Sequence, residues 1–255
     1  MQLGATELIA AHNHDLAAKR QQLKVKPALA IIWVGEDAET ASFIRAKQSR
    51  AKKLDCAFFS HHFVSSTTDQ LLALIQGLNR RRDVHGIVIQ LPLPKTIDLE
   101  SLIAQIGAEK DIDSLKPNSP YPAPAPSGII DLLTYHNIDP SNMRTAIIGA
   151  GRLVGSPLAE LFRERCWEFS QITDSAQKKT SFIKEHDLLI AASGVEGLVT
   201  PEMVHREMIV IDGSGKDVDV DKIEPLVKAV TPKRGAIGPL TVTWLFRNLF
   251  QSLGQ

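Results

Sequence analysis

The chain has 255 residues, and its 29 lysines and arginines balance 29 aspartates and glutamates, so the formal net charge is zero. It has no net positive field to attract nucleic acid or an anionic membrane, and no apolar run near the ~20 residues that cross a bilayer. The amino terminus lacks a basic-then-apolar signal pattern, and Cys56 and Cys166 lie far apart without a Cys-x-x-Cys spacing. We therefore expect a cytoplasmic protein with buried thiols and no nucleic-acid or membrane partner.

Helix and strand patterns alternate along the first part of the chain. We predict helices over residues 6–23, 39–54, 68–79 and 99–106, and strands over residues 28–34, 56–63 and 86–90. This alternation indicates an α/β fold with a parallel sheet and helices on its faces. His61 and His62 are adjacent on a predicted strand and point to opposite faces, which disfavours a metal site there.

Gln90 ends a short β-branched run and is followed by Pro92 and Pro94, which cannot extend a central strand. The side chain therefore lies at the carboxyl end of a predicted strand, the edge where ligands bind in open α/β sheets. There it could accept a hydrogen bond from a cation and donate one to a substrate. The alternative is a loop glutamine that caps backbone groups.

Two further polar residues are ambiguous from pattern alone. Lys47 is four residues after Phe43 on a predicted helix, so the two share a face, but lysine is usually exposed and a solvated cation is the default. Asp113 precedes five prolines within residues 117–126, which predict a stiff connector and a domain boundary. Its carboxylate is either a solvated linker charge or a ligand anchor at an interdomain cleft.

The second part of the chain has the pattern of a nucleotide-binding sheet. We predict helices over residues 128–136 and 242–253, and strands over residues 145–148, 167–172, 187–192 and 208–211. After the first of these strands, Gly149, Gly151 and Gly155 form a Gly-x-Gly-x-x-x-Gly turn that can face a pyrophosphate, although the spacing is looser than the usual fingerprint. Asp174, about twenty residues on, can bind a ribose hydroxyl. Alternatively, the glycines only make tight turns.

Five segments in the same order along the chain resemble the bifunctional methylenetetrahydrofolate dehydrogenase/cyclohydrolases of one-carbon metabolism. Residues 86–94 resemble that family's Val-Gln-Leu-Pro-Leu-Pro segment, and Lys47 falls where its active-site lysine lies on a helix. Residues 110–113 are similar to Lys-Asp-Val-Asp, residues 148–157 to its nucleotide turn, and residues 238–242 to Gly-Pro-Met-Thr-Val. The likeness covers nearly the whole chain.

The resemblance implies a two-domain α/β fold and a homodimer formed through the cofactor domain. Residues 1–122 with 237–255 would form the folate-binding catalytic domain, residues 123–236 a Rossmann-like domain, and the last helix would pack back on the first. Lys47 would assist proton transfer, held by Gln90, and Asp113 would bind the pterin ring. The other implied substrate-binding residues are Phe43, Gly238, Pro239 and Thr241; the implied cofactor-binding residues are Gly149, Ala150, Gly151, Arg152, Asp174, Ser175 and Gly215.

The chain also departs from the family pattern. Phe43 replaces a tyrosine, so the ring could still stack on substrate but the hydroxyl is lost. Ala150 and Gly151 replace an arginine and a serine that grip the 2′-phosphate of NADP. With Asp174 nearby, this site favours NAD, because a carboxylate repels that phosphate, although Arg152 could restore NADP binding. Ser114 replaces a glycine beside Asp113.

Three functions are consistent with these residues. The first is oxidation of 5,10-methylenetetrahydrofolate with NAD or NADP and hydrolysis of the 5,10-methenyl product to 10-formyltetrahydrofolate. The second is a relative that retains only the cyclohydrolase step or only binding. The third is a dehydrogenase of an unrelated small substrate. The joint presence of Lys47, Gln90 and Asp113 favours the first.

Overall fold

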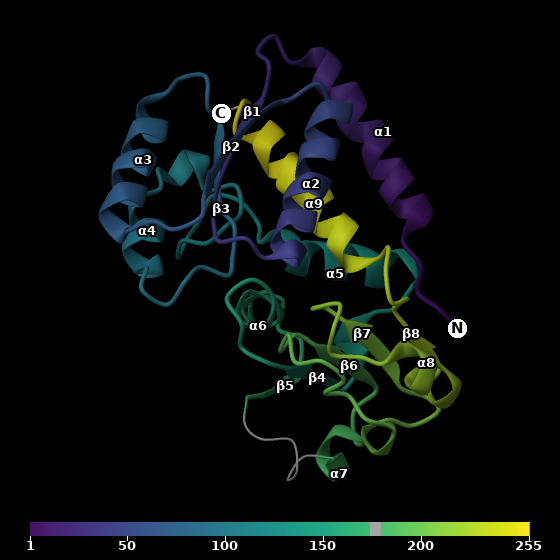
Figure 1. The fold of residues 1–255 in the computed structure, drawn as a ribbon. Coiled ribbons are helices and arrows are strands. Elements are labelled where there is room, and N and C mark those ends of the chain that lie inside the picture. Colours follow the sequence, from purple (N-terminus) through teal and green to yellow (C-terminus); the bar gives the residue numbers. More distant parts are fainter. Residues whose placement is uncertain (174–179, 255) are drawn as a thin grey trace. The chain divides into compact units, whose positions relative to one another are not determined.

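The computed structural model describes residues 1–173 and 180–254, which form two compact units. The small-sheet unit contains His12–Pro122 and Trp244–Gln255, and the large-sheet unit contains Met1–Ala11 and Ala123–Thr243. The division falls inside two helices, α1 (Thr6–Gln22) and α9 (Ile237–Gln251), which are labelled in Figure 1. Within the described ranges, no helix is long and apolar enough to cross a bilayer.

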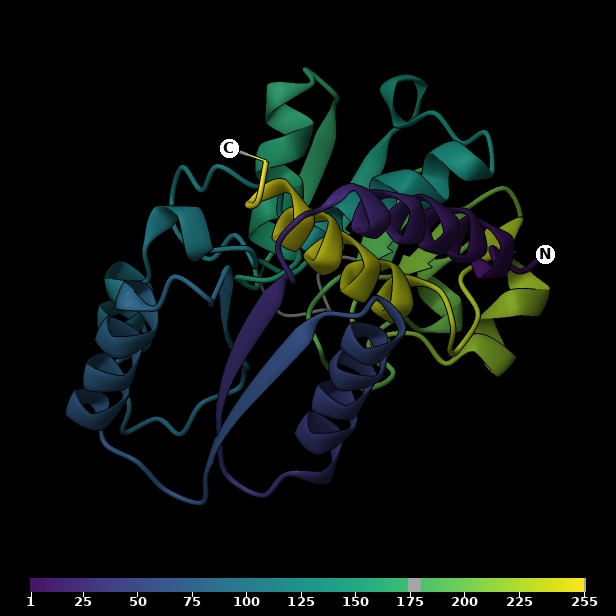
Figure 2. The same cartoon turned by 90° about the horizontal axis from the view of Figure 1, so that it is seen from above.

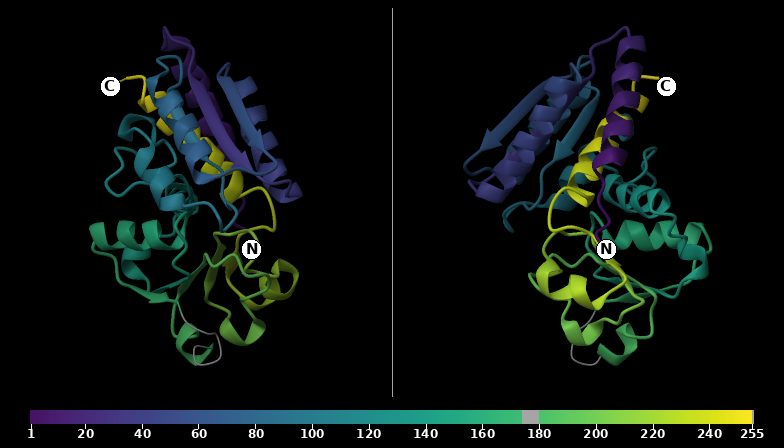
Figure 3. Two further views of the ribbon diagram at one scale, coloured as in Figure 1. Left: turned by 60° about the vertical axis from the view of Figure 1, so that its left-hand side comes forward. Right: turned by 90° about the vertical axis from the view of Figure 1, so that its right-hand side faces the viewer.

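The small-sheet unit is built on three parallel strands in the order β2-β1-β3. The strands are β1 (Ala28–Val34), β2 (Ala57–Phe63) and β3 (Gly86–Ile89). The helices between them are α2 (Ala38–Lys53), α3 (Thr68–Arg80) and α4 (Leu99–Gln105), followed by the short η1 (Ala108–Lys110). Figures 2 and 3 show α2 on one face of this sheet and α3 on the other.

Side-chain caps fix where these helices begin. Asp37 accepts a hydrogen bond from the Thr40 amide at 2.6 Å and starts α2. Thr67 and Gln70 form a reciprocal capping box at the start of α3. Such caps stabilise a helix by about 1 kcal/mol each because they satisfy amides that have no partner inside the helix. They also set where each strand-to-helix loop ends.

The large-sheet unit is built on five parallel strands in the order β5-β4-β6-β7-β8. The strands are β4 (Thr145–Ile148), β5 (Phe169–Ile172), β6 (Leu188–Ala191), β7 (Ile209–Asp212) and β8 (Ala229–Val230). The chain places β5 on one side of β4 and then β6 on the other. The strand order therefore reverses between β4 and β6, which is the point where open α/β sheets bind nucleotides.

Apolar side chains cover both faces of the large sheet. One face packs against the long helices α5 (Pro124–Tyr135) and α6 (Gly155–Glu164). The other packs against residues of α7 (Thr180–Ile183), η4 (Pro201–Met203) and α8 (Val220–Ile223). The short elements η2 (Pro140–Asn142) and η5 (Glu224–Leu226) also lie in this part of the described chain. Coverage on both faces explains why the strands are continuous apolar runs.

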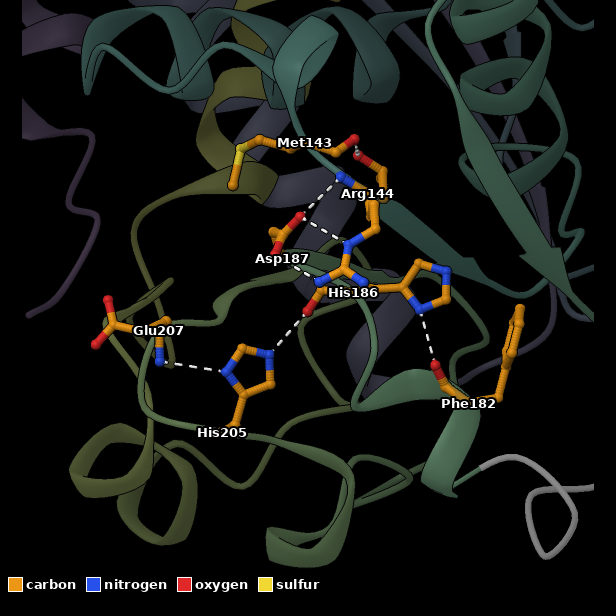
Figure 4. A network of polar contacts seen from close by, with 8 residues as sticks. Met143, Arg144, Phe182, His186, Asp187, His205 and Glu207 are labelled. Atoms are coloured by element: carbon orange, nitrogen blue, oxygen red, sulfur yellow. Dashed lines mark hydrogen bonds and ion pairs between the residues drawn. The ribbon is translucent and has the colours of Figure 1, made fainter.

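A polar network closes the amino-terminal ends of β4 and β6, and Figure 4 shows it from close by. The Arg144 guanidinium, just before β4, donates to the carboxylate of Asp187, just before β6, at 3.2 Å. Nδ1 of His205 accepts from the Glu207 amide, so its Nε2 donates to the His186 carbonyl at 2.9 Å. These bonds hold the end of the sheet opposite the nucleotide turn.

Two helices that carry proline in the first turn, α5 and α9, begin earlier than predicted. The predicted starts at residues 128 and 242 were wrong, because α5 begins at Pro124 and α9 at Ile237. Proline is tolerated there because the first amides of a helix have no acceptor within it. The prediction of buried thiols is also wrong for Cys166, which is exposed, whereas Cys56 is buried.

The limits of the two units differ from those expected at the chain's ends. Residues 1–11 and 237–243 belong to the large-sheet unit. The amide of Leu3 donates to the carbonyl of Val230 in β8 at 2.8 Å, and the amide of Val230 donates to the carbonyl of Met1 at 3.0 Å. Leu3 and Leu240 are both buried in the core of this unit. Residues 1–11 are therefore held in the large-sheet unit by backbone hydrogen bonds and apolar burial, and residues 237–243 by apolar burial. We had expected both segments in the folate-binding catalytic domain.

Candidate active site

The small-sheet unit brings Lys47 and Gln90 together at the carboxyl edge of its sheet. Lys47 lies on α2, and its Nζ donates to Oε1 of Gln90 at 2.7 Å. Gln90 directly follows β3, and its backbone amide donates to Ile32 of β1 at 2.9 Å, which continues the strand pairing by one residue. The helix α2 thus carries the amine, and the end of strand β3 carries the amide.

The orientation of the Gln90 amide is fixed by a second bond. Its Nε2 donates to the carbonyl of Leu91 at 2.9 Å, so Oε1 is the atom that faces Lys47. The Gln90 side chain is only 7% exposed. A buried amide whose oxygen and nitrogen are both hydrogen-bonded cannot rotate freely. It therefore holds the lysine nitrogen in one place.

Asp113 is the charged group that acts electrostatically on Lys47. Burial lowers the pKa of the Lys47 ammonium, and the Asp113 carboxylate partly opposes this shift. Burial likewise raises the pKa of Asp113, and Lys47 partly opposes that shift. For both groups, the effect of desolvation on the pKa outweighs that of their mutual attraction. The ammonium of Lys47 and the carboxylate of Asp113 are therefore less favoured here than the same groups are in water.

The loop that carries Asp113 is anchored by buried polar side chains on both sides of it. Nζ of Lys110 donates to three carbonyls at the end of α3, those of Leu78, Asn79 and Arg81, at 2.8–2.9 Å. Nδ2 of Asn248, on α9, donates to the carbonyl of Ile112 at 2.8 Å and to the carbonyl of Pro122 at 2.9 Å. These contacts hold the backbone on both sides of Asp113.

The departures at Phe43 and Ser114 have clear local structures. Phe43 lies one turn before Lys47 on α2 and is 45% exposed, so its ring is accessible. Ser114 has a φ of +55°, the left-handed conformation that favours glycine, and its hydroxyl donates to the carbonyl of Tyr121 at 2.9 Å. The loop keeps a glycine-like backbone although the residue is serine.

The large-sheet unit contains a tight glycine turn between β4 and α6. Gly149 has a φ of +100°, and a Cβ there would lie 2.6 Å from the carbonyl oxygen of Ala192. A Cβ on Gly155 would collide with the Gly149 carbonyl. Both positions therefore require glycine, and the turn brings backbone close to the amino end of α6. This arrangement fits a pyrophosphate.

The other predicted cofactor residues surround this turn or lie outside the described residues. Ala150, Gly151 and Arg152 are exposed in the turn itself. Gly215 is exposed in the loop after β7, with a φ of +78°. Asp174 and Ser175 fall outside the described residues.

The predicted substrate residues near the carboxyl end of the chain lie in the first turns of α9 rather than in a loop before it. Gly238 is exposed, and Pro239 and Thr241 are half-buried. The Thr241 hydroxyl donates to the Ile237 carbonyl at 2.8 Å. A Cβ on Gly128 of α5 would come within 2.9 Å of Leu240 Cβ, so α5 and the start of α9 are closely packed.

Two family profiles match most of the chain. The profile described as the catalytic domain of tetrahydrofolate dehydrogenase/cyclohydrolase matches residues 3–113, and the one described as its NAD(P)-binding domain matches residues 123–255. The chain belongs to the tetrahydrofolate dehydrogenase/cyclohydrolase family. The resemblance inferred from the sequence is confirmed, as is the two-domain α/β fold class.

Individual relatives of the family are similar over almost their whole length. The bifunctional protein FolD of Acholeplasma laidlawii is 34% identical, with 93% of this chain and 92% of that protein covered. FolD of Macrococcus caseolyticus is 32% identical, covering 96% and 95%. The crystal structure of the bifunctional methylenetetrahydrofolate dehydrogenase/cyclohydrolase FolD from Campylobacter jejuni has a TM-score of 0.90 at 29% identity, covering 100% of this chain and 98% of that one.

Some residues that shape this family member's site were not identified from the sequence. Asn248 reads as one polar residue in an amphipathic helix, and its partners lie 126 and 136 residues away in the chain. Lys110 belongs to the segment of residues 110–113 that resembles the family's Lys-Asp-Val-Asp. No local pattern in the sequence indicates that it binds the end of α3. A polar residue on the apolar face of a helix was the available signal for Asn248, since such a residue requires a buried partner.

Proposed function

We propose that this chain oxidises 5,10-methylenetetrahydrofolate with NAD(P) and hydrolyses the resulting 5,10-methenyltetrahydrofolate to 10-formyltetrahydrofolate. The observation that carries this proposal is the 2.7 Å hydrogen bond from Lys47 to the oriented amide of Gln90, beside Asp113. It is supported by the chain's membership of a family described as tetrahydrofolate dehydrogenase/cyclohydrolase.

Lys47 is the proposed proton-transfer group of the hydrolytic step. Burial lowers the pKa of its ammonium, which increases the fraction of neutral amine. A neutral amine can still donate one N–H to Oε1 of Gln90 while its lone pair accepts a proton from the attacking water. The water oxygen then bonds to the cationic methenyl carbon, which leaves a hydroxyl group on that carbon. Return of the proton from Lys47 to N5 allows the bond between the carbon and N5 to break, while the hydroxyl loses its proton to solvent and becomes the formyl carbonyl on N10.

Asp113 is the proposed anchor for the pterin ring. A carboxylate has two acceptor oxygens, which match the adjacent N–H donors of the pterin. Its partial burial strengthens such bonds, and the anchored loop limits its movement. Phe43 is proposed to stack on the substrate through its exposed ring, and Gly238, Pro239 and Thr241 to complete substrate binding.

The glycine turn fits a dinucleotide, because side chains at Gly149 or Gly155 would fill the space that the backbone needs. When NAD(P) is bound, its nicotinamide accepts the hydride of the first reaction. We propose that NAD is preferred, since Ala150 and Gly151 offer no positive or hydroxyl side chain for a 2′-phosphate, and Asp174 would repel one. Arg152 and Gly215 are also assigned to the nucleotide site in this proposal.

One assay tests the two activities together. The protein is mixed with methylenetetrahydrofolate and either NAD or NADP, and the absorbance of reduced cofactor and of methenyltetrahydrofolate is followed. Reduced cofactor and transient methenyl product are expected. If this mixture gives no reduced cofactor but methenyltetrahydrofolate supplied directly is hydrolysed, the chain is a cyclohydrolase alone. No signal in either channel would indicate a binding protein or a dehydrogenase of another substrate, and would contradict the proposal.

Lys47→Met tests the role of the amine. We expect the hydrolysis of methenyltetrahydrofolate to fall by at least about a hundredfold, the usual range for loss of a positioned proton-transfer group. The thermal midpoint should change little, because methionine is similar in length and the site is partly buried. Lys53→Met, an exposed lysine on the same helix, is the matched control. A Lys47→Met variant that hydrolyses substrate at the parent rate would refute the assignment.

A double substitution tests the nucleotide preference. Ala150→Arg with Gly151→Ser should raise kcat/KM for NADP about tenfold, because a charge-assisted bond to a phosphate contributes about 1.5–3 kcal/mol. Among the described residues, the nearest atom that a Cβ at position 151 would meet is the Ala192 carbonyl oxygen at 3.7 Å, an ordinary contact, so serine fits there. An unchanged ratio of NAD to NADP activity would exclude these two positions as determinants.

We further propose that the protein is a cytoplasmic homodimer. The dimer would form through the nucleotide-binding unit, where β5 is an edge strand of the five-stranded sheet and so has an outer edge to which a second chain could bind. Light scattering coupled to gel filtration tests this, with twice the mass of 28.0 kDa expected. In this proposal the small-sheet unit binds folate and the large-sheet unit binds the nucleotide.

A further inference from the structure

Two buried aspartates lie outside the residues assigned above. Asp217 is fully buried, and its carboxylate accepts three bonds from the loop after β6. These come from the amide of Ser193 at 2.6 Å, the hydroxyl of Ser193 at 2.9 Å and the amide of Val195 at 2.7 Å. A buried carboxylate is costly unless its oxygens are well bonded, and here the bonds join two different loops.

Asp212, at the end of β7, fixes the second of these loops from inside. It is 7% exposed, and its Oδ1 accepts from the amides of Ser214 at 3.1 Å and Gly215 at 2.7 Å. Its Oδ2 accepts from the amide of Val218 at 3.2 Å. The carboxylate therefore sets the path of residues 213–218, including the exposed Gly215.

The two loops are also joined along their backbones. The amide of Gly197 donates to the carbonyl of Lys216 at 2.9 Å, and the amide of Val199 donates to the carbonyl of Asp217 at 2.9 Å. Residues 193–199 and 213–218 therefore form one hydrogen-bonded unit, which we call the paired loops. Asp217 forms the side-chain link between them.

The paired loops border the glycine turn of the nucleotide site. A Cβ on Gly213 would come within 3.2 Å of the Val154 side chain, which is in the turn. Gly149 lies against the carbonyl of Ala192, the residue before Ser193. The paired loops follow β6 and β7, on the opposite side of β4 from β5. In doubly wound sheets the acid after the neighbouring strand, here β5, takes the adenosine ribose, so the other half of a dinucleotide lies over β6.

We propose that Asp217 and Asp212 are positioning residues that hold the paired loops in the shape that receives the nicotinamide half of NAD(P). The inference rests on the proposed use of NAD(P) and adds which residues shape that half of the site. Carboxylates suit this role because one group can accept several amide bonds from a loop that has no regular structure. A neutral amide of the same size has one acceptor oxygen in place of two, so it cannot accept from the amides of Ser193 and Val195 through two separate oxygens as the carboxylate does.

Asp217→Asn is the direct test, since it preserves shape and removes the charge. We expect the KM for NAD(P) to rise at least about tenfold, with a smaller change in kcat, because hydrogen bonds to a charged acceptor are stronger than those to a neutral one. Inhibition by 5′-AMP, which carries only the adenosine half, should keep the parent inhibition constant. Hydrolysis of methenyltetrahydrofolate, which uses no nucleotide, should also keep the parent rate.

Two further variants complete the experiment. Asp221→Asn is the matched control, an exposed aspartate four residues later. Ser193→Ala removes one donor to Asp217 and is used if Asp217→Asn does not fold, with the same expected pattern on a smaller scale. Thermal unfolding confirms that each variant is folded.

Three results would overturn the inference. A folded Asp217→Asn variant with the parent KM for NAD(P) would show that the paired loops do not depend on this carboxylate. A parallel loss of 5′-AMP inhibition, or of cyclohydrolase rate, would show a general structural role. Calorimetric binding of NADH separates this inference from the proposed reaction, because weakened NADH binding in the variant supports the inference even if no folate is turned over.

Discussion

At the scale of single residues, the chemistry depends on the protonation of Lys47. Burial lowers the pKa of its ammonium, and the proposed hydrolysis needs the neutral amine. The enzymatic rate of methenyltetrahydrofolate hydrolysis, after subtraction of the rate without enzyme, should therefore fall as pH is lowered through this pKa. Lys47→Arg should be inactive at every pH, since a guanidinium does not lose its proton in proteins.

Gln90→Glu provides the complementary shift in the same profile. A carboxylate 2.7 Å from Nζ would favour the ammonium and raise the pKa of Lys47. The midpoint of the rate profile should then move to higher pH, while the maximal rate at high pH is partly retained. A midpoint that stays in place, or moves to lower pH, would mean that Lys47 is not the titrating group.

At the scale of elements, α9 and the loop before α5 are coupled by Asn248. Its Nδ2 bonds the carbonyls of Ile112 and Pro122, and the side chain is fully buried. Asn248→Leu leaves both carbonyls without this donor, at about 1–3 kcal/mol for each buried group. The substitution also removes Oδ1 of Asn248, which is buried without a hydrogen-bond partner among the described residues. Removing this unsatisfied oxygen offsets part of that cost. We expect a lower thermal midpoint and a higher KM for folate in both reactions.

The KM for NAD(P) should stay near the parent value in Asn248→Leu, since its two bonds lie around Asp113 and not at the glycine turn. Gln251→Leu, at an exposed position of the same helix, is the control for added apolar surface. Equal effects of the two variants on folate binding would contradict a specific role for Asn248.

The elements that sequence could predict were those with a simple local cause. The strands over residues 28–34 and 145–148 were predicted with the bounds that the structure has, because apolar runs bounded by glycine or proline are unambiguous. The predicted start of α5 was wrong because Pro124 and Pro126 were assigned to a connector, whereas proline is well tolerated in the first turn of a helix. The two-residue strand β8 depends on pairing with β7 and has no pattern of its own.

The contacts of the candidate site could likewise not be predicted from local sequence patterns. Residue pattern alone favoured a solvated cation at Lys47, and only the ordered resemblance of five segments pointed to a site. The contact with Gln90 joins residues 43 positions apart, and no local rule predicts it. Asp217 was not predicted either, since its partners lie 22 and 24 residues away across two loops.

At the scale of the whole molecule, neither unit is a continuous segment of chain. The core of the large-sheet unit includes Leu3 and Leu240, both fully buried, and Ile237, which is 6% exposed. A fragment of residues 123–236, which the sequence suggests as the cofactor domain, lacks all three. Each such burial contributes about 1.5–3 kcal/mol, against a total of about 5–15 kcal/mol for a typical domain.

We therefore expect the 123–236 fragment to unfold at a much lower temperature than the full chain, or to fail to fold. It also lacks the strand-like bonds between Val230 and residues 1–3, which leaves β8 unpaired on its outer side. Circular dichroism and NADH binding measure the outcome. A fragment of residues 123–243, mixed with a peptide of residues 1–11, restores the missing core residues and should recover NADH binding. If the shorter fragment binds NADH as tightly as the full chain does, the end segments are dispensable to this fold.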